Sequence, residues 1–223
     1  MVCGDLDGDG KDDLIGDWSG TWCYYNDSTW TRLTTASPGQ CGMATGDLDG
    51  DGNADLIGDW SGTWIYMNDS TWKRITTDSP GVGGIVCGDL DGHGKADLIG
   101  DWPPNGTWAY MNDTNWTRLT TASPGPGGMV CGDLDGDGNA DLIGDWSGTW
   151  CYMNDTNWKR ITTGSPGAGG LATGDLDSGG KADLIGDWPP NGTWCYMNDT
   201  NWKRITGDSP SAGGLVTGNI DGN

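Results

Sequence analysis

The sequence predicts an all-β protein, a β-propeller of four-stranded antiparallel blades. An acidic nine-residue loop recurs five times at spacings of 42 to 44 residues, beginning at Asp5, Asp47, Asp89, Asp133 and Asp175. Between successive loops lie short segments with strand-like alternation and no helical periodicity. One four-stranded sheet cannot bury both of its faces, whereas sheets stacked radially as blades can.

The first repeat shows how four strands fill each period. The expected elements are, in order, a strand at 1–6 leading into the acidic loop, a strand at 13–18, a two-residue turn at Ser19–Gly20, a strand at 21–25, a turn at 26–28 and a strand at 30–35. A Ser-Pro-Gly loop then leads to the next repeat. In the third and fifth repeats the two-residue turn is lengthened to Pro-Pro-Asn-Gly, which explains their 44-residue period.

The length fits a single propeller domain, 1–223, with five blades at 1–42, 43–84, 85–128, 129–170 and 171–214. Residues 215–223 overhang as the start of a sixth repeat. They trail outside a closed ring, pair in place of the first strand, or belong to a molecule with more blades. The alternative architecture is an open or filamentous stack in which the overhang pairs with another chain. Because the chain starts and stops at one phase of the repeat, we interpret it as a segment of a longer or processed protein.

Each acidic loop has the spacing of a divalent cation site. In the first loop Asp5, Asp7, Asp9 and Asp13 occupy positions 1, 3, 5 and 9, and Ca²⁺ accepts six to eight oxygen ligands in flexible geometry. Glycine at positions 4 and 6 permits the tight curl, and the variable position 7 is expected to offer its main-chain carbonyl. An EF-hand would need a Glu at position 12 and flanking helices, but that position is Gly16 and the chain contains no Glu.

The predicted ligands of the five loops are Asp5, Asp7, Asp9, Lys11, Asp13; Asp47, Asp49, Asp51, Asn53, Asp55; Asp89, Asp91, Lys95, Asp97; Asp133, Asp135, Asp137, Asn139, Asp141; and Asp175, Asp177, Lys181, Asp183. Loops one, two and four are complete. His93 and Gly179 replace the position-5 carboxylate in loops three and five, so we expect weaker Ca²⁺ sites there. Solvated acidic turns are the alternative, and five copies in phase favour the metal.

Composition limits the possible partners. The formal net charge is −21, which argues against nucleic acid and anionic membrane surfaces. No stretch approaches the roughly 20 apolar residues of a membrane span, and no signal peptide opens the chain. Fifteen Trp and six Tyr can build a core although only 34% of residues are hydrophobic. Six of the seven Cys occupy positions filled by Thr, Ile or Ala in other repeats, which favours small packing residues over disulfides. Cys41 is alone in its loop, and the odd count leaves at least one thiol unpaired within the chain.

The repeated motif Gly-Asp-Leu-Asp-Gly-Asp-Gly-x-x-Asp-Leu-Ile-Gly resembles the FG-GAP/VCBS repeat family. Its members include the calcium-loop propellers of integrin α heads, many secreted proteins and some fungal lectins. The resemblance covers the whole chain. It implies Ca²⁺ in the acidic loops, an extracellular or cell-surface location and an adhesive or scaffolding role. Many relatives close with seven blades, whereas this chain shows five short and very similar ones.

Catalysis is not expected, because the chain has one His, no Glu and no nucleophile with a base at plausible spacing. The first functional hypothesis is a binding or adhesion module for carbohydrate or an extracellular protein. Tryptophan faces stack on sugar CH groups, and Arg binds hydroxyls. The candidate glycan-binding residues are Trp18, Trp22, Trp30, Arg32, Trp60, Trp64, Trp72 and Arg74. The alternatives are that Trp18 and Trp22 belong to the core between blades, and that Trp30 and Arg32 form a cation–π pair.

The second hypothesis is a structural, N-glycosylated building block of an extracellular filament or surface assembly. Asn-x-Ser/Thr sequons occur at Asn26, Asn68, Asn105, Asn112, Asn115, Asn154, Asn191 and Asn198, all in expected turns or strand ends. The same triplets are also good turn chemistry. The near-identical blades and the overhanging residues favour self-assembly.

Overall fold

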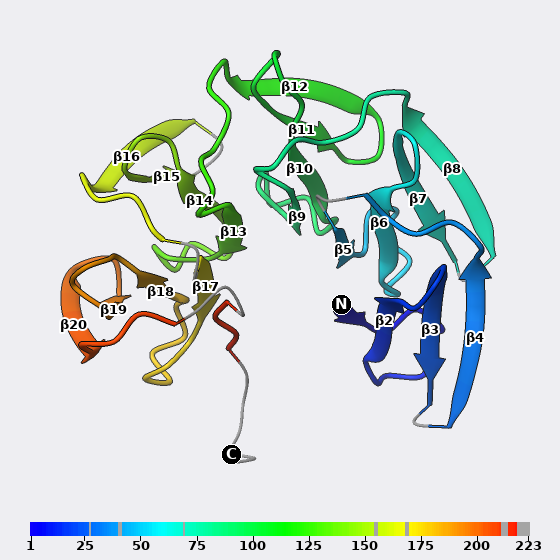
Figure 1. The fold of residues 1–223 in the computed structure, drawn as a ribbon, viewed down its shortest axis with the longest axis horizontal. Helices are drawn as coiled ribbons and strands as arrows, with labels where there is room; N and C mark the ends of the chain where they lie inside the picture. The colour runs from blue at the N-terminus through cyan, green and yellow to red at the C-terminus, as the bar shows by residue number, and fades with distance from the viewer. Residues whose placement is uncertain are drawn as a thin grey trace. The chain divides into compact units, whose positions relative to one another are not determined.

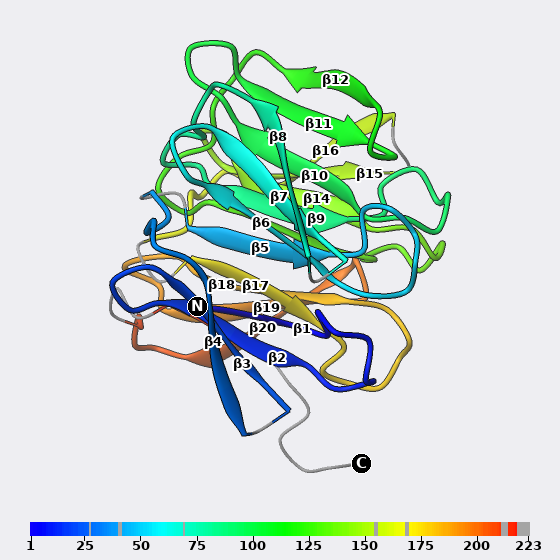
Figure 2. The ribbon, with the colours of Figure 1, turned by 90° about the vertical axis from the view of Figure 1, so that its right-hand side faces the viewer.

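The computed structural model describes residues 1–26, 28–39, 42–68, 70–153, 156–167, 170–210 and 214–217. These residues form twenty strands in five antiparallel sheets of four, and no helix (Figures 1 and 2). Within each sheet the strands follow one another in chain order. The predicted all-β fold with five four-stranded blades is therefore confirmed. The sixth acidic loop at 219–223, Cys41 and the sequon residue Asn154 lie outside the described residues.

The strands of the five sheets are β1 Val2–Gly4, β2 Asp13–Asp17, β3 Thr21–Tyr25, β4 Thr29–Thr34; β5 Met43–Gly46, β6 Asp55–Asp59, β7 Thr63–Met67, β8 Thr71–Thr76; β9 Ile85–Gly88, β10 Asp97–Asp101, β11 Thr107–Met111, β12 Asn115–Thr120; β13 Met129–Gly132, β14 Asp141–Asp145, β15 Thr149–Met153, β16 Asn157–Thr162; and β17 Leu171–Gly174, β18 Asp183–Asp187, β19 Thr193–Met197, β20 Asn201–Thr206. These bounds agree closely with the four strands expected in each repeat.

The chain forms two compact units. One comprises Met1–Cys87 and His93–Ser123, and the other comprises Gly88–Gly92 and Pro124–Asn223. The first unit carries the first three blades apart from a short piece of the third acidic loop and its preceding strand end. The second unit carries the fourth and fifth blades. The assignment of 1–223 to a single propeller domain stays a prediction.

The two-residue turn between the second and third strands of a blade is a left-handed pair. Ser19 and Gly20 have φ of 59° and 119°, the backbone that tight antiparallel hairpins favour. The register that follows pairs Gly16 with Trp22. Gly16 lies under the indole ring of Trp18, and a Cβ there would come within 2.4 Å of the ring. Glycine therefore lets this Trp fold back over its own strand.

The core lies between neighbouring sheets of the same unit. Leu48, Ile57 and Ile65 of the second blade pack in one cluster with Leu98 and Trp102 of the third. The second strand of each of the last four blades is buried along its whole length. An Asp-Leu-Ile-Gly-Asp strand with both faces covered is what stacked blades require.

The Trp that follows the second strand belongs to this core where a preceding blade packs against it. Trp102 is 5% exposed and Trp188 is 6% exposed, whereas Trp18 is 46% exposed. The indole Nε1 of Trp102 donates a hydrogen bond to Thr63 of the preceding blade at 3.2 Å, and Trp60 donates equivalently to Thr21 at 2.9 Å. The interpretation that Trp18 belongs to the core between blades is therefore wrong, because Trp18 belongs to the first blade and is half-exposed, whereas the equivalent Trp102 and Trp188 are buried.

The cysteines of the third strands are small packing residues. Cys23, Cys151 and Cys195 are buried, and Cys23 and Cys151 belong to apolar clusters. Burial also raises the pKa of the Cys195 thiol to about 11. A thiol with so high a pKa stays protonated and unreactive near neutral pH. These positions fit the packing role that substitution by Ile65 and Ala109 in other blades indicates.

Candidate metal sites and aromatic clefts

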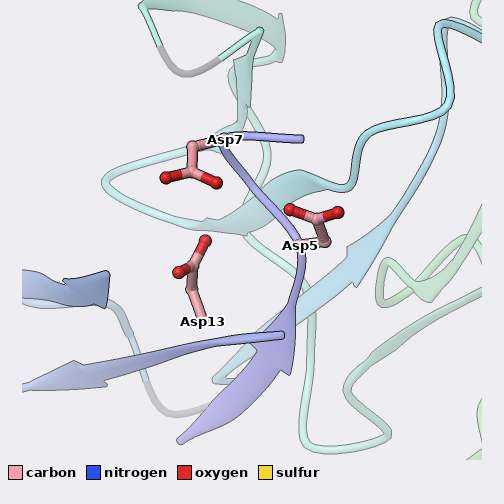
Figure 3. Close-up of side chains that lie close together, drawn as sticks. All are labelled: Asp5, Asp7 and Asp13. Carbon is pink, nitrogen blue, oxygen red and sulfur yellow. The ribbon is translucent and has the colours of Figure 1, made fainter. Parts of the chain in front are cut away.

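Three carboxylates converge in the first acidic loop (Figure 3). Asp5 and Asp7 lie on the loop that follows β1, and Asp13 is the first residue of β2. One oxygen of each lies within 4.8 Å of the others. A set of three carboxylate oxygens is the donor chemistry that Ca²⁺ and Mg²⁺ prefer.

The same three loop positions, 1, 3 and 9, converge in every repeat. The other groups are Asp47, Asp49, Asp55; Asp89, Asp91, Asp97; Asp133, Asp135, Asp141; and Asp175, Asp177, Asp183. These repeated aspartate groups could hold metal ions.

Main-chain N–H groups hold the carboxylates in place. In the first loop Asp5 accepts hydrogen bonds from the N–H groups of Gly8 and Gly10, both at 2.8 Å. Asp13 accepts one from Leu6 at 3.0 Å. Gly8 and Gly10 have φ of 76° and 86°, a left-handed backbone that favours glycine. These main-chain hydrogen bonds fix the orientation of the Asp5 and Asp13 carboxylates.

The first four acidic loops are also each tied to the next blade by a main-chain hydrogen bond. The main-chain carbonyl of Asp5 accepts a hydrogen bond from the N–H of Ala54 at 2.7 Å, and Asp47 accepts equivalently from Ala96 at 2.7 Å. In the second unit Asp133 accepts from Ala182 at the same distance. The residue that opens one loop is therefore bonded to the eighth residue of the following loop. An ion that fixes one loop also stabilises contact between neighbouring blades.

The clustered carboxylates are costly to ionise together. Burial raises the pKa of Asp55 from 3.8 to about 6; the N–H of Leu48 opposes this shift, and the neighbouring carboxylate of Asp49 adds to it. The pKa of Asp141 is raised to about 6 for the same reasons. In the exposed fifth loop, the N–H of Gly180 lowers the pKa of Asp175 instead. A bound cation would remove the penalty at the buried positions.

The fourth predicted carboxylate, at loop position 5, lies outside these groups of three. Asp9 accepts a hydrogen bond from the N–H of Lys11 at 2.9 Å, and the Lys11 ammonium lies 3.7 Å from it. The predicted ranking of the loops depended on His93 and Gly179 at this position. Since positions 1, 3 and 9 converge in all five loops, the weaker binding of the third and fifth stays a prediction. So does the use of the position-7 carbonyl.

An asparagine in the turn after the third strand was not predicted at these sites. The side-chain amide of Asn26 donates to Asp7 at 2.8 Å, and that of Asn68 donates to Asp49 at 2.9 Å and Asp51 at 2.7 Å. Asn198 donates equivalently to Asp177 at 2.7 Å. The sequence placed these residues in sequons, but their amides face the acidic loops. The signal that could have found them is an Asn at the same position of every repeat.

Aromatic side chains form the same ladder in every blade. In the third blade Trp116 lies edge-on to Trp102 with ring centroids 5.0 Å apart and planes at 89°, and it packs on Tyr110 at 4.9 Å. The guanidinium of Arg118 lies 5.7 Å from the ring of Trp108. These are the favourable geometries for aromatic pairs and for cation–π contact.

The cation–π pair predicted between Trp30 and Arg32 is wrong, because the partner of Arg32 is Trp22. Arg32 lies 5.8 Å from the ring of Trp22, because the register of β3 and β4 places Trp22 opposite Arg32 and Trp30 opposite Tyr24. Arg74 covers Trp64 in the same way at 5.8 Å. One face of each Trp22-type ring is therefore occupied by an arginine.

Two aromatic clefts occupy the same repeat position in different units. In the first unit Trp102, Asn105, Trp108 and Trp116 line a cavity of about 260 Å³, together with Ile75, Thr76 and Asp78 of the preceding blade. In the second unit the lining residues of a cavity of about 340 Å³ are Trp188, Asn191, Trp194 and Trp202, with Thr162, Thr163 and Gly164 of the preceding blade. The glycan-binding candidates Trp18 to Arg74 line neither cleft.

The comparisons with known proteins agree with this architecture. Residues 5–58 match the FG-GAP-like repeat, a span that contains the first two acidic loops. The other loops repeat the same motif in the same phase. Residues 5–58 are thus similar to the FG-GAP-like repeat, and the later repeats carry the same motif. No curated protein matches it in sequence.

Solved structures that resemble these FG-GAP-like repeats share the fold at low identity. The rhamnogalacturonan lyase YesW is 18% identical with a TM-score of 0.55, over 93% of this chain and 50% of the lyase chain. BBS1N in complex with ARL6DN gives 12% identity and a TM-score of 0.57, over 91% of this chain and 63% of that one. The V. cholerae biofilm matrix protein Bap1 is 18% identical with a TM-score of 0.50, over 89% of this chain and 37% of that chain. The chain thus spans about half the length of the lyase it matches, and these likenesses concern the β-propeller fold.

Among the described residues, no helix has the length and apolar character needed to cross a membrane.

Proposed function

We propose that this chain is an extracellular binding module, a β-propeller stabilised by Ca²⁺, and that its ligand is carbohydrate. The observation that carries the proposal is the pair of equivalent clefts, each lined by three tryptophans and one asparagine. Indole faces contact the CH groups of sugar rings, and an amide supplies both a donor and an acceptor for hydroxyl groups. A mostly aromatic wall with few polar groups is typical of small-ligand sites.

The charge of the chain favours neutral sugars. A formal net charge of −21 repels anionic ligands over distances up to about 10 Å at moderate salt. Ca²⁺ in the acidic loops would reduce this charge without reversing it. Neutral oligosaccharides are therefore better supported as ligands than acidic polysaccharides or nucleic acid.

The role of Ca²⁺ in this proposal is structural. The groups of three aspartates lie in loops that are hydrogen-bonded to the next blade, so an ion there would strengthen the stacking of blades. We assign no catalytic role to the chain: in this proposal the carboxylates of the loops hold the metal, and the clefts carry mainly aromatic and amide groups, with Asp78 the one carboxylate among their lining residues. FG-GAP-like repeats would then act as a binding scaffold.

The test is a glycan array probed with the labelled chain in Ca²⁺ and in excess chelator. We expect the chain to bind neutral glycans in Ca²⁺. In chelator we expect binding to weaken in proportion to the fraction of folded protein that is lost, and circular dichroism measures that fraction. Retention of only acidic glycans, or of none, would contradict the proposal.

A second function, a building block of a self-assembled structure, is favoured by one surface. Leu176 and Ile205 of the fifth blade are 51% and 53% exposed, although Leu48 and Leu134, which are equivalent to Leu176, are fully buried and Ile75 and Ile161, which are equivalent to Ile205, are half-buried. Together with Leu215 and Val216 they line an apolar cavity of about 740 Å³. A second copy of the chain covering this face would appear as a concentration-dependent dimer in light scattering, and Ile205→Asp would abolish it.

A further inference from the structure

We propose that the chain carries two sugar subsites, one on the long hairpin of the third blade and one on that of the fifth, each taking one neutral pyranose ring or a disaccharide. This inference rests on the proposed carbohydrate-binding function and deepens it.

The long hairpins distinguish these blades from the other three. The first, second and fourth blades close the turn with Ser-Gly, whereas the third and fifth use Pro-Pro-Asn-Gly. In the short form the indole Nε1 of Trp22 donates to the carbonyl of Trp18 at 3.2 Å. In the long form Trp108 donates to the carbonyl of Asn105 at 3.3 Å, and Trp194 donates to that of Asn191 at 3.1 Å. The insertion therefore adds an exposed asparagine to a wall that already carries three tryptophans.

The walls of the third-blade cleft are fixed before any ligand binds. Trp102 is almost buried and is held through its hydrogen bond to Thr63. Trp116 stands at 89° to it, and Trp108 is held by the hairpin carbonyl and by Arg118. Two indole planes at right angles offer one face and one edge to a bound ring. Since the side chains are already ordered, little conformational entropy is lost on binding.

The size of the clefts sets the size of the ligand. The volume of about 340 Å³ for the fifth-blade cleft lies at the lower end of the range of about 300 to 1,000 Å³ for small-molecule pockets, and the volume of about 260 Å³ for the third-blade cleft lies just below that range. They suit one or two sugar rings. A longer glycan would extend past the cleft into solvent, so affinity for a single cleft should not increase with chain length beyond two or three sugars.

The two clefts differ at one repeat position. Asp78 contributes to the third-blade cleft, and Gly164 stands at the equivalent place in the fifth. A carboxylate accepts hydrogen bonds from two neighbouring hydroxyl groups or from an ammonium group. The third-blade cleft should therefore prefer neutral sugars with vicinal hydroxyl groups at that edge, whereas the fifth-blade cleft should depend on stacking and on Asn191.

The experiment is isothermal titration of the whole chain, in Ca²⁺, with four neutral trisaccharides built from N-acetylglucosamine, glucose, galactose or mannose. The test variant is Trp116→Ala with Trp202→Ala. The matched control is Trp72→Ala with Trp158→Ala, the same ladder position in short-hairpin blades, where each Trp makes the same two ring contacts. We expect two sites per wild-type chain for at least one sugar, an affinity loss of at least about tenfold in the test variant, and little change in the control.

A second variant covers the case in which the double substitution fails to fold. It replaces 103–106 and 189–192 by Ser-Gly, the turn that three blades of this chain already use, and should also abolish binding. If the wild type binds a trisaccharide but the test and hairpin variants bind it equally well, the assignment to the long hairpins is overturned while carbohydrate binding stands. If the wild type binds none of the four sugars, both fail.

Discussion

Replacing Asp55 by Asn should change the stability of the metal-free chain little and should lower the stability strongly when Ca²⁺ is present. Asp55 is 1% exposed, and it accepts a hydrogen bond from the N–H of Leu48 at 2.9 Å and another from the N–H of Asn68. Burial raises its pKa from 3.8 to about 6. Asparagine keeps the shape and one acceptor oxygen but removes the charge.

Without metal, two effects of Asp55→Asn nearly cancel. At about 1.4 kcal/mol per pKa unit, ionising Asp55 above pH 7 would cost the folded state up to about 3 kcal/mol, and screening by solvent that reaches the loop reduces this to about 1 kcal/mol. The variant removes that cost. It also leaves one N–H without its acceptor, which costs about 1 kcal/mol. The melting temperature in excess chelator should therefore change by no more than about 3 °C.

With Ca²⁺ the same change should be strongly destabilising. At a free ion concentration 100 times the dissociation constant, binding contributes about 2.7 kcal/mol to the stability of the folded state. Losing that and one hydrogen bond amounts to about 3 to 4 kcal/mol, or roughly 10 °C in a chain of this size. Thermal unfolding followed by circular dichroism in Ca²⁺ and in chelator measures both values.

The control for this experiment is Asp59→Asn. Asp59 accepts hydrogen bonds from the hydroxyl of Ser79 at 2.6 Å and the N–H of Gly62 at 3.2 Å, and it lies outside the acidic loops. Its variant should lower the melting temperature equally in both buffers. An Asp55→Asn variant that behaves like this control would show that Asp55 serves only as a hydrogen-bond acceptor, and the metal-site reasoning would be wrong.

Three further outcomes are expected. The pKa of Asp141 in the folded chain is raised to about 6. Protonation of Asp141 therefore stabilises the metal-free chain fully below about pH 4, and this stabilisation is lost as the pH rises through 6. In chelator the chain should melt at a higher temperature at pH 5 than at pH 7.5, and the opposite order would refute this. Trp102→Phe deletes the hydrogen bond to Thr63 and part of the packing, and should cost about 2 kcal/mol in denaturant unfolding. Asn68→Ala removes two amide donors from the second acidic loop and should lower stability in chelator by about 1 kcal/mol, whereas Asn115→Ala, whose amide is exposed, should have no measurable effect.

Much of the fold was predictable because the repeat makes local patterns unambiguous. The strands and hairpins of the structure were predicted from three patterns. These are the 42- to 44-residue period of the acidic loop, the alternation of side chains over residues 21–25 and the turn at Ser19–Gly20. The convergence of Asp5 and Asp13 also followed from spacing, since one precedes and the other begins a strand in the same hairpin. Local geometry set by turns and strand register is what a sequence specifies most directly.

The contacts between strands were harder to predict. Trp30 and Arg32 are two residues apart, yet the register shift in the strand pair brings Arg32 over Trp22 instead. Trp18 and Trp102 both follow the sequence Asp-Leu-Ile-Gly-Asp, yet their exposures differ, because burial depends on the blade beside the tryptophan and on the length of the turn after it. The clefts arise from a four-residue turn whose sequence indicated only a longer loop. Such features depend on how neighbouring blades pack, which a single repeat does not encode.

The most direct test of calcium-stabilised carbohydrate binding is an electron-density map of crystals grown with Ca²⁺ and the tightest-binding trisaccharide. We expect an ion coordinated by Asp5, Asp7 and Asp13 and by the equivalent groups of the other blades, and sugar rings against Trp116 and Trp202. Loops that hold only water, together with clefts that hold no sugar at saturating concentration, would contradict both parts of the proposal.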